Sequence, residues 1–192
     1  MDAVAALRTG RPVLLPADGV YGLCSATTEE AVRRLYELKG RAEAQPTALI
    51  AANVEELPRL TPRDAVIARA LLPGPWTLVL ANPSGVFPWL SGGRPDTIGV
   101  RVPVLPIESQ RVLDAVGLVA ATSANEPGEP PAARVEDVPE RIRAGCGAIV
   151  DAGELGGEPS TVLDFTGPEP LILRRGAGDA DAALARLRRV VG

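Results

Sequence analysis

Histidine is absent from the 192 residues of this chain, and its absence excludes several classes of enzyme. Ser-His-Asp and Cys-His nucleophilic systems need an imidazole as general base, so neither can be built here. Metal sites with histidine ligands are excluded for the same reason.

Cysteine is nearly as scarce, because Cys24 and Cys146 are the only two in the chain. Two widely separated thiols form neither a disulfide framework nor a metal-ligand spacing. The sequence also lacks an apolar run long enough to span a membrane, and it lacks the basic segment and apolar core of a signal peptide. We therefore expect a protein of the reducing cytoplasm, without membrane association and without a metal site of its own.

Lysine occurs once, as Lys39, among nineteen arginines. It lies in Lys39-Gly40-Arg41, where a compact ammonium suits a phosphate and the glycine lets the backbone approach a ligand closely. The alternative interpretation is a cation that only stabilises the carbonyl end of a helix. The net charge of −4 and the pI of about 5.0 argue against broad nucleic-acid binding and leave room for a local basic cleft.

Short apolar runs predict strands along the whole chain. They span Val13–Leu15, Val20–Leu23, Ala48–Ala51, Thr77–Ala81, Ile98–Val102, Leu118–Ala121, Ala148–Val150, Ser160–Phe165 and Leu171–Leu173. Helical periodicity predicts helices over Glu29–Leu38, Arg63–Leu72, Ile107–Val116 and Ala180–Val191. Thr27 and Glu30 have the spacing of a capping box at the start of the first helix.

The interleaving of strands with helices indicates an α/β protein. Because the strands outnumber the helices, some neighbouring strands must pair without a crossover helix. We expect a single-domain twisted mixed sheet with flanking helices, extending over residues 1–192.

The common nucleotide-binding motifs are missing, including the glycine-rich dinucleotide turn, the Walker loop and the kinase signatures. Candidate ligand contacts are instead scattered over the chain. Thr122–Asn125 follow the strand ending at Ala121, where α/β sheets place ligand contacts, although the same residues also suit a self-capped turn. Arg101 alternates with the apolar Val100 and Val102, so its charge needs a partner, either a carboxylate or a bound anion.

Seven short motifs occur in an order that resembles the YrdC family. They are Pro16-Ala17-Asp18-Gly19-Val20-Tyr21-Gly22-Leu23, Lys39-Gly40-Arg41, Pro73-Gly74-Pro75-Trp76-Thr77-Leu78, Val100-Arg101-Val102-Pro103, Ser123-Ala124-Asn125, Ser160-Thr161-Val162 with Asp164, and Leu173-Arg174 with Gly176-Ala177. The similarity extends roughly from Pro12 to Gly178, and the length resembles the short single-domain bacterial form. Members of that family are threonylcarbamoyl-AMP synthases.

The resemblance implies that L-threonine and bicarbonate form a carbamate, which attacks the α-phosphate of ATP. The products are threonylcarbamoyl-adenylate and pyrophosphate, and a separate transferase passes the threonylcarbamoyl group to A37 of certain tRNAs. Because a carbamate is already an anionic nucleophile, catalysis reduces to positioning and charge neutralisation. Mg²⁺ on the phosphates is also expected, with no dedicated protein cage, and so is weak RNA binding.

The resemblance further implies roles for particular positions. Lys39 and Arg41 would be catalytic and hold the ATP phosphates. The nucleotide would also contact Thr97, Ser123, Asn125 and Arg174. The threonine would lie against Arg101, Ala121, Ser160 and Gly19, with Arg101 pairing with its carboxylate.

Some positions depart from the family pattern. Ala17 and Gly19 flank Asp18 where relatives have hydroxyl residues, Gln45 stands where they often have lysine or asparagine, and Pro127 replaces the serine of a Ser-Gly pair. A pocket without partners for a substrate hydroxyl discriminates threonine poorly. A paralogue that uses another amino acid or carboxylate is therefore an alternative.

Other hypotheses stay open at this stage. A domain that forms carbamoyl-adenylate for hydrogenase maturation normally belongs to a longer chain with zinc-finger segments. A non-catalytic nucleotide- or RNA-binding module would show a steep salt dependence, and the acidic pI argues against it. An ordinary structural domain would require the ordered motifs to be coincidence.

Overall fold

The computed structural model describes residues 1–42 and 44–191. The α-helices are α1 (Ala3–Arg8), α2 (Glu29–Lys39), α3 (Pro62–Leu71), α4 (Ile107–Val116), α5 (Glu140–Gly145) and α6 (Ala180–Val191). Short 3₁₀ helices are η1 (Val54–Glu56), η2 (Pro88–Leu90) and η3 (Val135–Asp137). The strands are β1 (Val13–Pro16), β2 (Tyr21–Ser25), β3 (Ala48–Ala51), β4 (Trp76–Ala81), β5 (Thr97–Arg101), β6 (Leu118–Ser123), β7 (Ala148–Ile149), β8 (Thr161–Asp164) and β9 (Leu171–Arg174).

All of these described strands join one sheet, in the order β7-β1-β2-β6-β3-β5-β4-β8-β9. The pairs β1–β7, β3–β5 and β4–β8 are parallel, and the remaining neighbours are antiparallel. The predicted mixed α/β sheet is therefore confirmed. The extent of a single domain over residues 1–192 stays a prediction, which the continuous sheet supports.

The structure differs from the sequence prediction at the helix ends and in two short helices. Helices α1 and α5 have six residues each, too few for a helical period to stand out in the sequence. Helix α2 begins at Glu29, so its N-cap is Thr28 and not Thr27. Glu30 pairs with Arg34 at 2.6 Å, one helical turn away, and does not complete a capping box.

Buried side chains cover both faces of the sheet. In β1, Leu14 belongs to the larger cluster, which includes residues of α2, α3, α5 and α6. Val13 and Leu15, which point to the opposite face, pack with α1 and α4 in a smaller cluster. Among the described residues, this smaller cluster includes none from β4, β5, β8 or β9, so α1 and α4 cover only part of their face.

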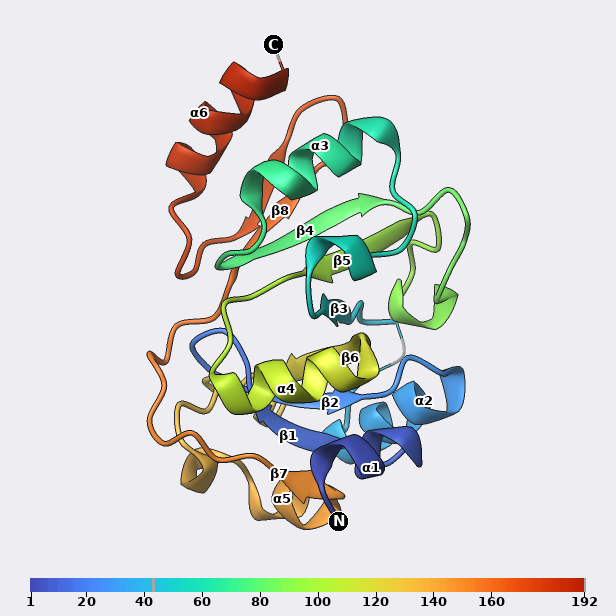
Figure 1. The fold of residues 1–192 in the computed structure, drawn as a ribbon, viewed down its shortest axis with the longest axis vertical. Coiled ribbons are helices and arrows are strands. Elements are labelled where there is room, and N and C mark those ends of the chain that lie inside the picture. The colour runs from blue at the N-terminus through green and yellow to red at the C-terminus, as the bar shows by residue number, and fades with distance from the viewer. Residues whose placement is uncertain (43, 192) are drawn as a thin grey trace.

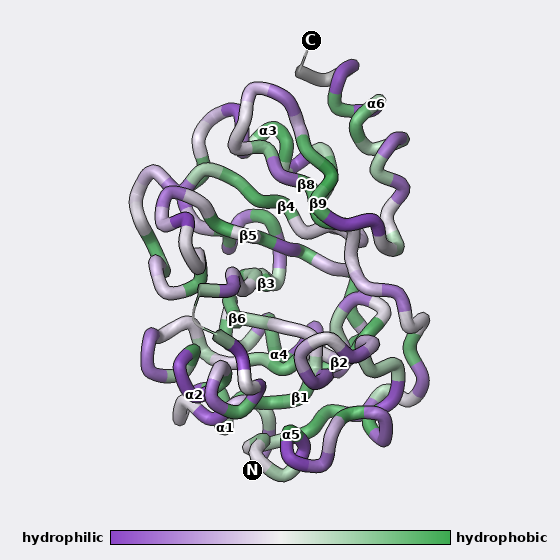
Figure 2. The backbone as a smooth tube through the Cα atoms, turned by 180° about the vertical axis from the view of Figure 1, so that it is seen from behind, coloured by the Kyte–Doolittle hydropathy of each residue, from purple (hydrophilic) through white to green (hydrophobic). Residues whose placement is uncertain are grey.

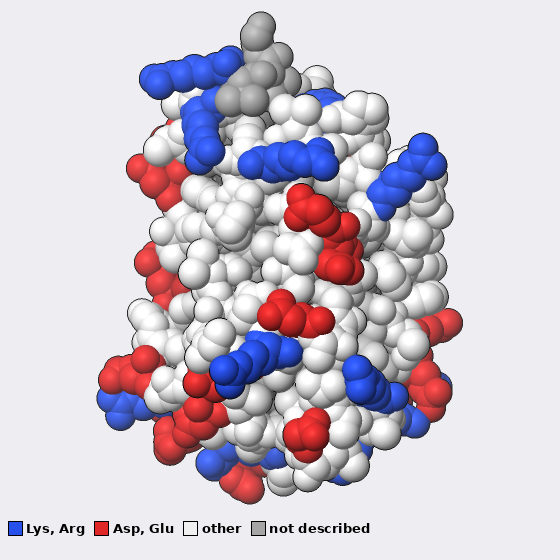
Figure 3. Space-filling model, in the orientation of Figure 1, with Lys and Arg blue, Asp and Glu red and all other residues white. Residues whose placement is uncertain are grey.

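The arrangement of the elements separates the molecule into two ends. Figure 1 shows α3, α6 and β8 at one end and α1, α5 and β7 at the other. In Figure 2, seen from behind, hydrophobic colouring runs along several central strands, whereas α6 alternates between hydrophobic and hydrophilic residues. On the face drawn in Figure 3, acidic and basic side chains intermingle, and basic ones gather at the end that carries α6.

No helix in the described part of the chain is long and apolar enough to cross a bilayer.

The larger cluster can be tested with a matched pair of leucines on neighbouring strands. Leu163→Ala on β8 is expected to lower the free energy of unfolding by about 2–5 kcal/mol, because it leaves a cavity in the core. Leu163 is 0% exposed, whereas Leu171 on β9 is 57% exposed. Leu171→Ala should therefore change stability by about 0.5 kcal/mol or less. Urea unfolding followed by tryptophan fluorescence measures both, and equal losses would contradict the assignment of the core.

Candidate active site

A cavity of about 330 Å³ lies on the part of the sheet face that α1 and α4 leave open. Small residues of neighbouring strands form its floor, since Gly22 pairs with Ser123 and Ala48 with Ala121. Gly99 also lies there, where an added Cβ would be 3.7 Å from the Ala48 Cα. The hollow therefore arises because these positions carry little or no side chain.

Four arginines and several hydroxyl side chains line this cavity, and none of the described lining residues is Asp or Glu. The arginines come from the loop after α2, the loop before β5 and the ends of β5 and β9: Arg41, Arg94, Arg101 and Arg174. The hydroxyl residues are Thr47, Thr77, Ser91, Thr97, Thr122 and Ser123. Guanidinium groups donate only, so the wall is suited to an anionic ligand.

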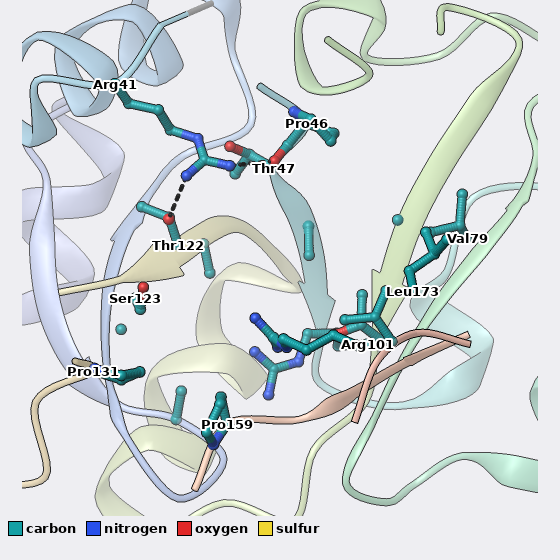
Figure 4. Close-up of a pocket in the computed structure, with 18 of the residues that line it drawn as sticks. Arg41, Pro46, Thr47, Val79, Arg101, Thr122, Ser123, Pro131, Pro159 and Leu173 are labelled. Carbon is teal, nitrogen blue, oxygen red and sulfur yellow. Dashed lines mark hydrogen bonds between the residues drawn. The ribbon is translucent and has the colours of Figure 1, made fainter. Parts of the chain in front are cut away.

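The end of α2 directs Arg41 toward the cavity. Gly40 adopts a left-handed conformation with φ of 66°, and the Arg41 N–H donates back to the last turn of the helix at 2.9 Å. The Arg41 guanidinium then donates to Thr122 Oγ1 at 3.3 Å and to the Pro46 carbonyl at 2.6 Å (Figure 4). Burial lowers the pKa of Arg41.

Lys39 has different surroundings, although it is only two residues away. Its ammonium donates to the Ser123 carbonyl at 2.7 Å, to Asn125 Oδ1 at 2.8 Å and to the Asn125 carbonyl. An ammonium has three protons, so these contacts use all of its donors. Burial, together with the positive charge of Arg41, lowers the pKa of Lys39 to about 8. In this conformation Lys39 fixes the turn that follows β6 and does not line the cavity.

Arg101 is the most enclosed cation of the cavity. As the sequence alternation predicts, Val100 is in the core and Arg101 points to the opposite face. Its Nη2 lies 3.2 Å from Asp18 Oδ2, and the two side chains are only 12% and 15% exposed. Burial lowers the pKa of Arg101, which Asp18 opposes, and burial raises the pKa of Asp18, which Arg101 opposes.

Arg174 lies close to Arg101 on the same face. Its Nε and Nη2 donate to the Ser160 carbonyl at 3.1 and 2.7 Å. Burial is the largest cause that lowers the pKa of Arg101, and the positive charge of Arg174 lowers it further. Two like charges held together in a partly desolvated cavity favour a bound anion between them.

Arg94 brings a fourth guanidinium to the wall from the loop before β5. It donates to Asp164 Oδ2 at 2.8 Å and to Thr166 Oγ1 at 2.6 Å. These contacts leave Arg94 at the edge of the cavity, since about half of its side chain is exposed.

Some buried polar atoms of the cavity have no hydrogen-bond partner among the described residues. They are Nε of Arg41, Nε of Arg101 and Oγ1 of Thr47. Buried donors and hydroxyls are nearly always paired in native proteins, so these atoms are candidates for contacts with a ligand.

The structure brings most of the predicted site residues to this one cavity. Those that line it are Arg41, Thr97, Arg101, Ala121, Ser123 and Arg174. The others, Lys39, Asn125, Ser160 and Gly19, adjoin or contact the lining residues without lining it themselves. Their roles in binding stay predictions.

Several lining residues are absent from the sequence prediction, among them Arg94, Thr47 and Ser91. They lie outside the regular elements, so no periodicity marks which way their side chains point. The single signal for Arg94 was its charge, which it shares with eighteen other arginines.

The fold and the cavity define an α/β protein with an arginine-lined pocket on an open sheet face. The family model Sua5_yciO_yrdC, described as telomere recombination, matches residues 5–176. The chain belongs to this family, which confirms the resemblance drawn from its motifs.

Relatives in this family carry one recurring name. A threonylcarbamoyl-AMP synthase from Halorhodospira halophila is 39% identical, over 84% of this chain and 87% of the relative. One from Pyrococcus abyssi is 35% identical, over 99% of this chain and 56% of the relative. The chain thus spans only about half the length of some relatives that it matches.

Solved structures show the same fold. P. abyssi Sua5 complexed with L-threonine matches with a TM-score of 0.85 at 33% identity, over 99% of this chain and 56% of that one. E. coli YciO matches with a TM-score of 0.81 at 27% identity, over 92% and 88% of the two chains.

The state of Lys39 can be measured directly, because the chain has no other lysine. Selective labelling gives a single lysine side-chain NMR signal, which can be followed as the pH is changed. We expect the midpoint of this titration near pH 8, since burial disfavours the ammonium. Added tripolyphosphate should raise that midpoint, because a nearby anion favours the charged form. A midpoint that tripolyphosphate leaves unchanged would restrict Lys39 to holding the turn after β6.

Proposed function

We propose that this protein is a threonylcarbamoyl-AMP synthase that acts on L-threonine, bicarbonate and ATP. The observation that carries the proposal is the cavity itself, whose described lining includes four arginines and no carboxylate. A triphosphate and a carbamate are both anions, and a reaction between them needs positive charge on several sides. The name of the relatives, which match this chain over most of its length, supports the same conclusion.

The chemistry fits a chain without histidine. The amine of the amino acid and bicarbonate give a carbamate and water. One carbamate oxygen then forms a bond to the α-phosphorus, while the bond from that phosphorus to the bridging oxygen breaks and pyrophosphate leaves with the electron pair. No proton is removed in the second step, so the protein has to align and neutralise the reactants and needs no imidazole base.

The cationic residues divide between the two reactants in this proposal. Arg41 and Arg174 hold the phosphates, and the unpaired Nε of Arg41 is one donor available to them. Lys39 acts beside them, positioning Ser123 and Asn125 through its three hydrogen bonds.

The polar residues around these cations would complete both subsites. Thr97, Ser123 and Asn125 contact the nucleotide. Arg101 pairs with the carboxylate of the amino acid. Ser160 lies beside this subsite, because its carbonyl accepts a hydrogen bond from Arg174, whose charge acts on Arg101.

Mg²⁺ is expected on the phosphates of ATP, where it would offset their charge. The described residues contain no group of three or more His, Cys, Asp or Glu that could hold a metal ion. In this proposal the ion arrives with the nucleotide.

The product is an activated mixed anhydride, which a second enzyme must consume. We propose a transferase complex that modifies tRNA as that enzyme, working with this protein in the cytoplasm. Weak RNA binding would use the basic end of the molecule, where α6 carries Arg186, Arg188 and Arg189 (Figure 3).

Two arginine variants separate the proposed subsites. Arg41→Ala should lower kcat for pyrophosphate release about 10²–10³-fold, because it removes a donor to the developing phosphate charge. Arg101→Ala should mainly raise KM for the amino acid, because it removes the partner of the carboxylate. Release is measured with ATP, Mg²⁺, bicarbonate and a panel of amino acids, and the adenylate is identified by mass spectrometry.

Arg111→Ala, at an exposed position on α4, serves as the matched control and should keep the activity of the parent protein. Absence of pyrophosphate release with every amino acid would contradict the proposal. Release that needs neither an amino acid nor bicarbonate would indicate a different reaction.

A further inference from the structure

One buried hydroxyl of the cavity lacks a hydrogen-bond partner. Thr47 lines the cavity and is only 3% exposed, and its Oγ1 has no partner among the described residues. The other buried side-chain atoms without a partner in the described part of the chain are guanidinium nitrogens. A hydroxyl removed from water without a partner costs free energy, so this group points to a contact that forms when the cavity is filled.

Other buried hydroxyls of the cavity are satisfied by the fold itself. Ser91 Oγ donates to the Thr97 carbonyl at 2.8 Å, and Thr97 Oγ1 donates to the Arg94 carbonyl at 2.9 Å. The segment that leads into β5 thus supplies partners for its own side chains. The described residues supply none for the Thr47 hydroxyl.

The backbone at Thr47 is held in place by contacts on both sides. The Thr47 N–H donates to the Leu90 carbonyl at 2.9 Å, and the Pro46 carbonyl accepts from Arg41 Nη2 at 2.6 Å. The chain also packs closely here, since an added Cβ at Gly92 would lie 2.9 Å from the Pro46 nitrogen. A side chain on such a fixed segment loses little freedom when it pairs with a ligand.

The nearest cation to this hydroxyl is directed at the same region. Figure 4 shows the Thr47 side chain beside the Arg41 guanidinium, which donates to the carbonyl of the preceding residue, Pro46. Nε of Arg41 is also buried without a partner. A ligand that pairs with both groups must present more than one acceptor, and the ionised oxygens of a phosphate chain do so.

The proposed amino-acid subsite lies further along the sheet. Thr47 directly precedes β3, whereas the register partner of Arg101 on that strand is Ile50. Three residues of a strand span about 10 Å. Figure 4 likewise shows Arg101 apart from Thr47 and Arg41. The position of Thr47 therefore favours a contact with the phosphates over one with the amino acid.

We propose that the Thr47 hydroxyl binds phosphate and donates a hydrogen bond to the triphosphate chain of ATP, beside the Arg41 guanidinium. This inference rests on the proposed function and adds a residue to its phosphate subsite. The contact gives the buried hydroxyl the partner that it lacks in the fold, and a hydrogen bond to an ionised oxygen is about twice as strong as a neutral one.

Thr47→Val tests the proposal, because valine keeps the shape of threonine and replaces its hydroxyl with a methyl group. The dissociation constants for ATP and for tripolyphosphate should each rise about 10–100-fold, the value of one hydrogen bond to a charged group. Isothermal titration calorimetry measures both without turnover. Tripolyphosphate lacks the nucleoside, so a loss of affinity confined to ATP would overturn the assignment to the phosphates.

The stability of the ligand-free protein distinguishes ligand binding from a structural role. Thr47→Val removes a buried hydroxyl that has no partner, so Tm should stay the same or rise while the affinity for ATP falls. A hydroxyl that supported the fold would give the reverse, a lower Tm with the ATP affinity of the parent protein. That result would overturn the proposal.

Thr47→Ser is the matched control, because it keeps the hydroxyl and removes the methyl group. Its affinities for ATP and tripolyphosphate should remain close to those of the parent protein. Equal losses in the serine and valine variants would assign the effect to the methyl group and contradict the proposal. The same comparison decides the matter if Thr47→Val lowers Tm, since serine restores the affinity only if the hydroxyl binds the ligand.

Pyrophosphate release separates this inference from the proposed function. Thr47→Val should raise KM for ATP and leave KM for the amino acid unchanged, and a rise confined to the amino acid would overturn the inference. If the parent protein releases no pyrophosphate with any amino acid, the proposed function fails, and the binding measurements still decide the role of Thr47. Binding of neither ATP nor tripolyphosphate to the parent protein would overturn that role as well.

Discussion

The confinement of like charges is the constraint on which this cavity depends. Burial lowers the pKa of Arg41, Arg101 and Arg174, and the side chain of Arg101 is only 12% exposed, whereas Arg174 is an exposed residue. Only Arg101 among these three has a carboxylate partner, Asp18, in the described structure. Like charges brought together in this cavity repel one another, and a bound anion would offset that repulsion.

The sheet supplies this arrangement through side-chain size as much as through charge. One face carries large residues that pack against α2, α3, α5 and α6. The other carries glycine and alanine at facing positions of β2, β3, β5 and β6, next to the patch that α1 and α4 cover. A hollow remains because small side chains cannot fill the space, and the arginines reach into it from strand ends and loops.

Lys39 shows how one turn can serve two purposes. Gly40 ends α2 and separates two adjacent cations, one buried under the Ser123–Asn125 turn and the other facing the cavity. The buried ammonium fixes the backbone that carries Ser123, while Arg41 stays available to a ligand. A guanidinium in place of Lys39 would present its donors in a planar fork, which does not match three acceptors converging on one nitrogen.

The sequence by itself determined the mixed α/β fold, the alternation that places Arg101 opposite Val100, and the family. These features depend on local periodicity and on the order of short motifs, both of which are written in the chain. It also showed that Ala17 and Gly19 carry no hydroxyl. It did not reveal the N-cap at Thr28, the short helices α1 and α5, or the roles of Arg94 and Thr47 as lining residues, because one-residue offsets and loop conformations leave no periodic signal. Only the tertiary structure decided that the Lys39 ammonium donates its hydrogen bonds to the turn after β6. It also decided that the Glu158 carbonyl fills the space beside Gly19. Both are contacts between segments far apart in sequence, and such contacts are set by how the sheet brings its strands together.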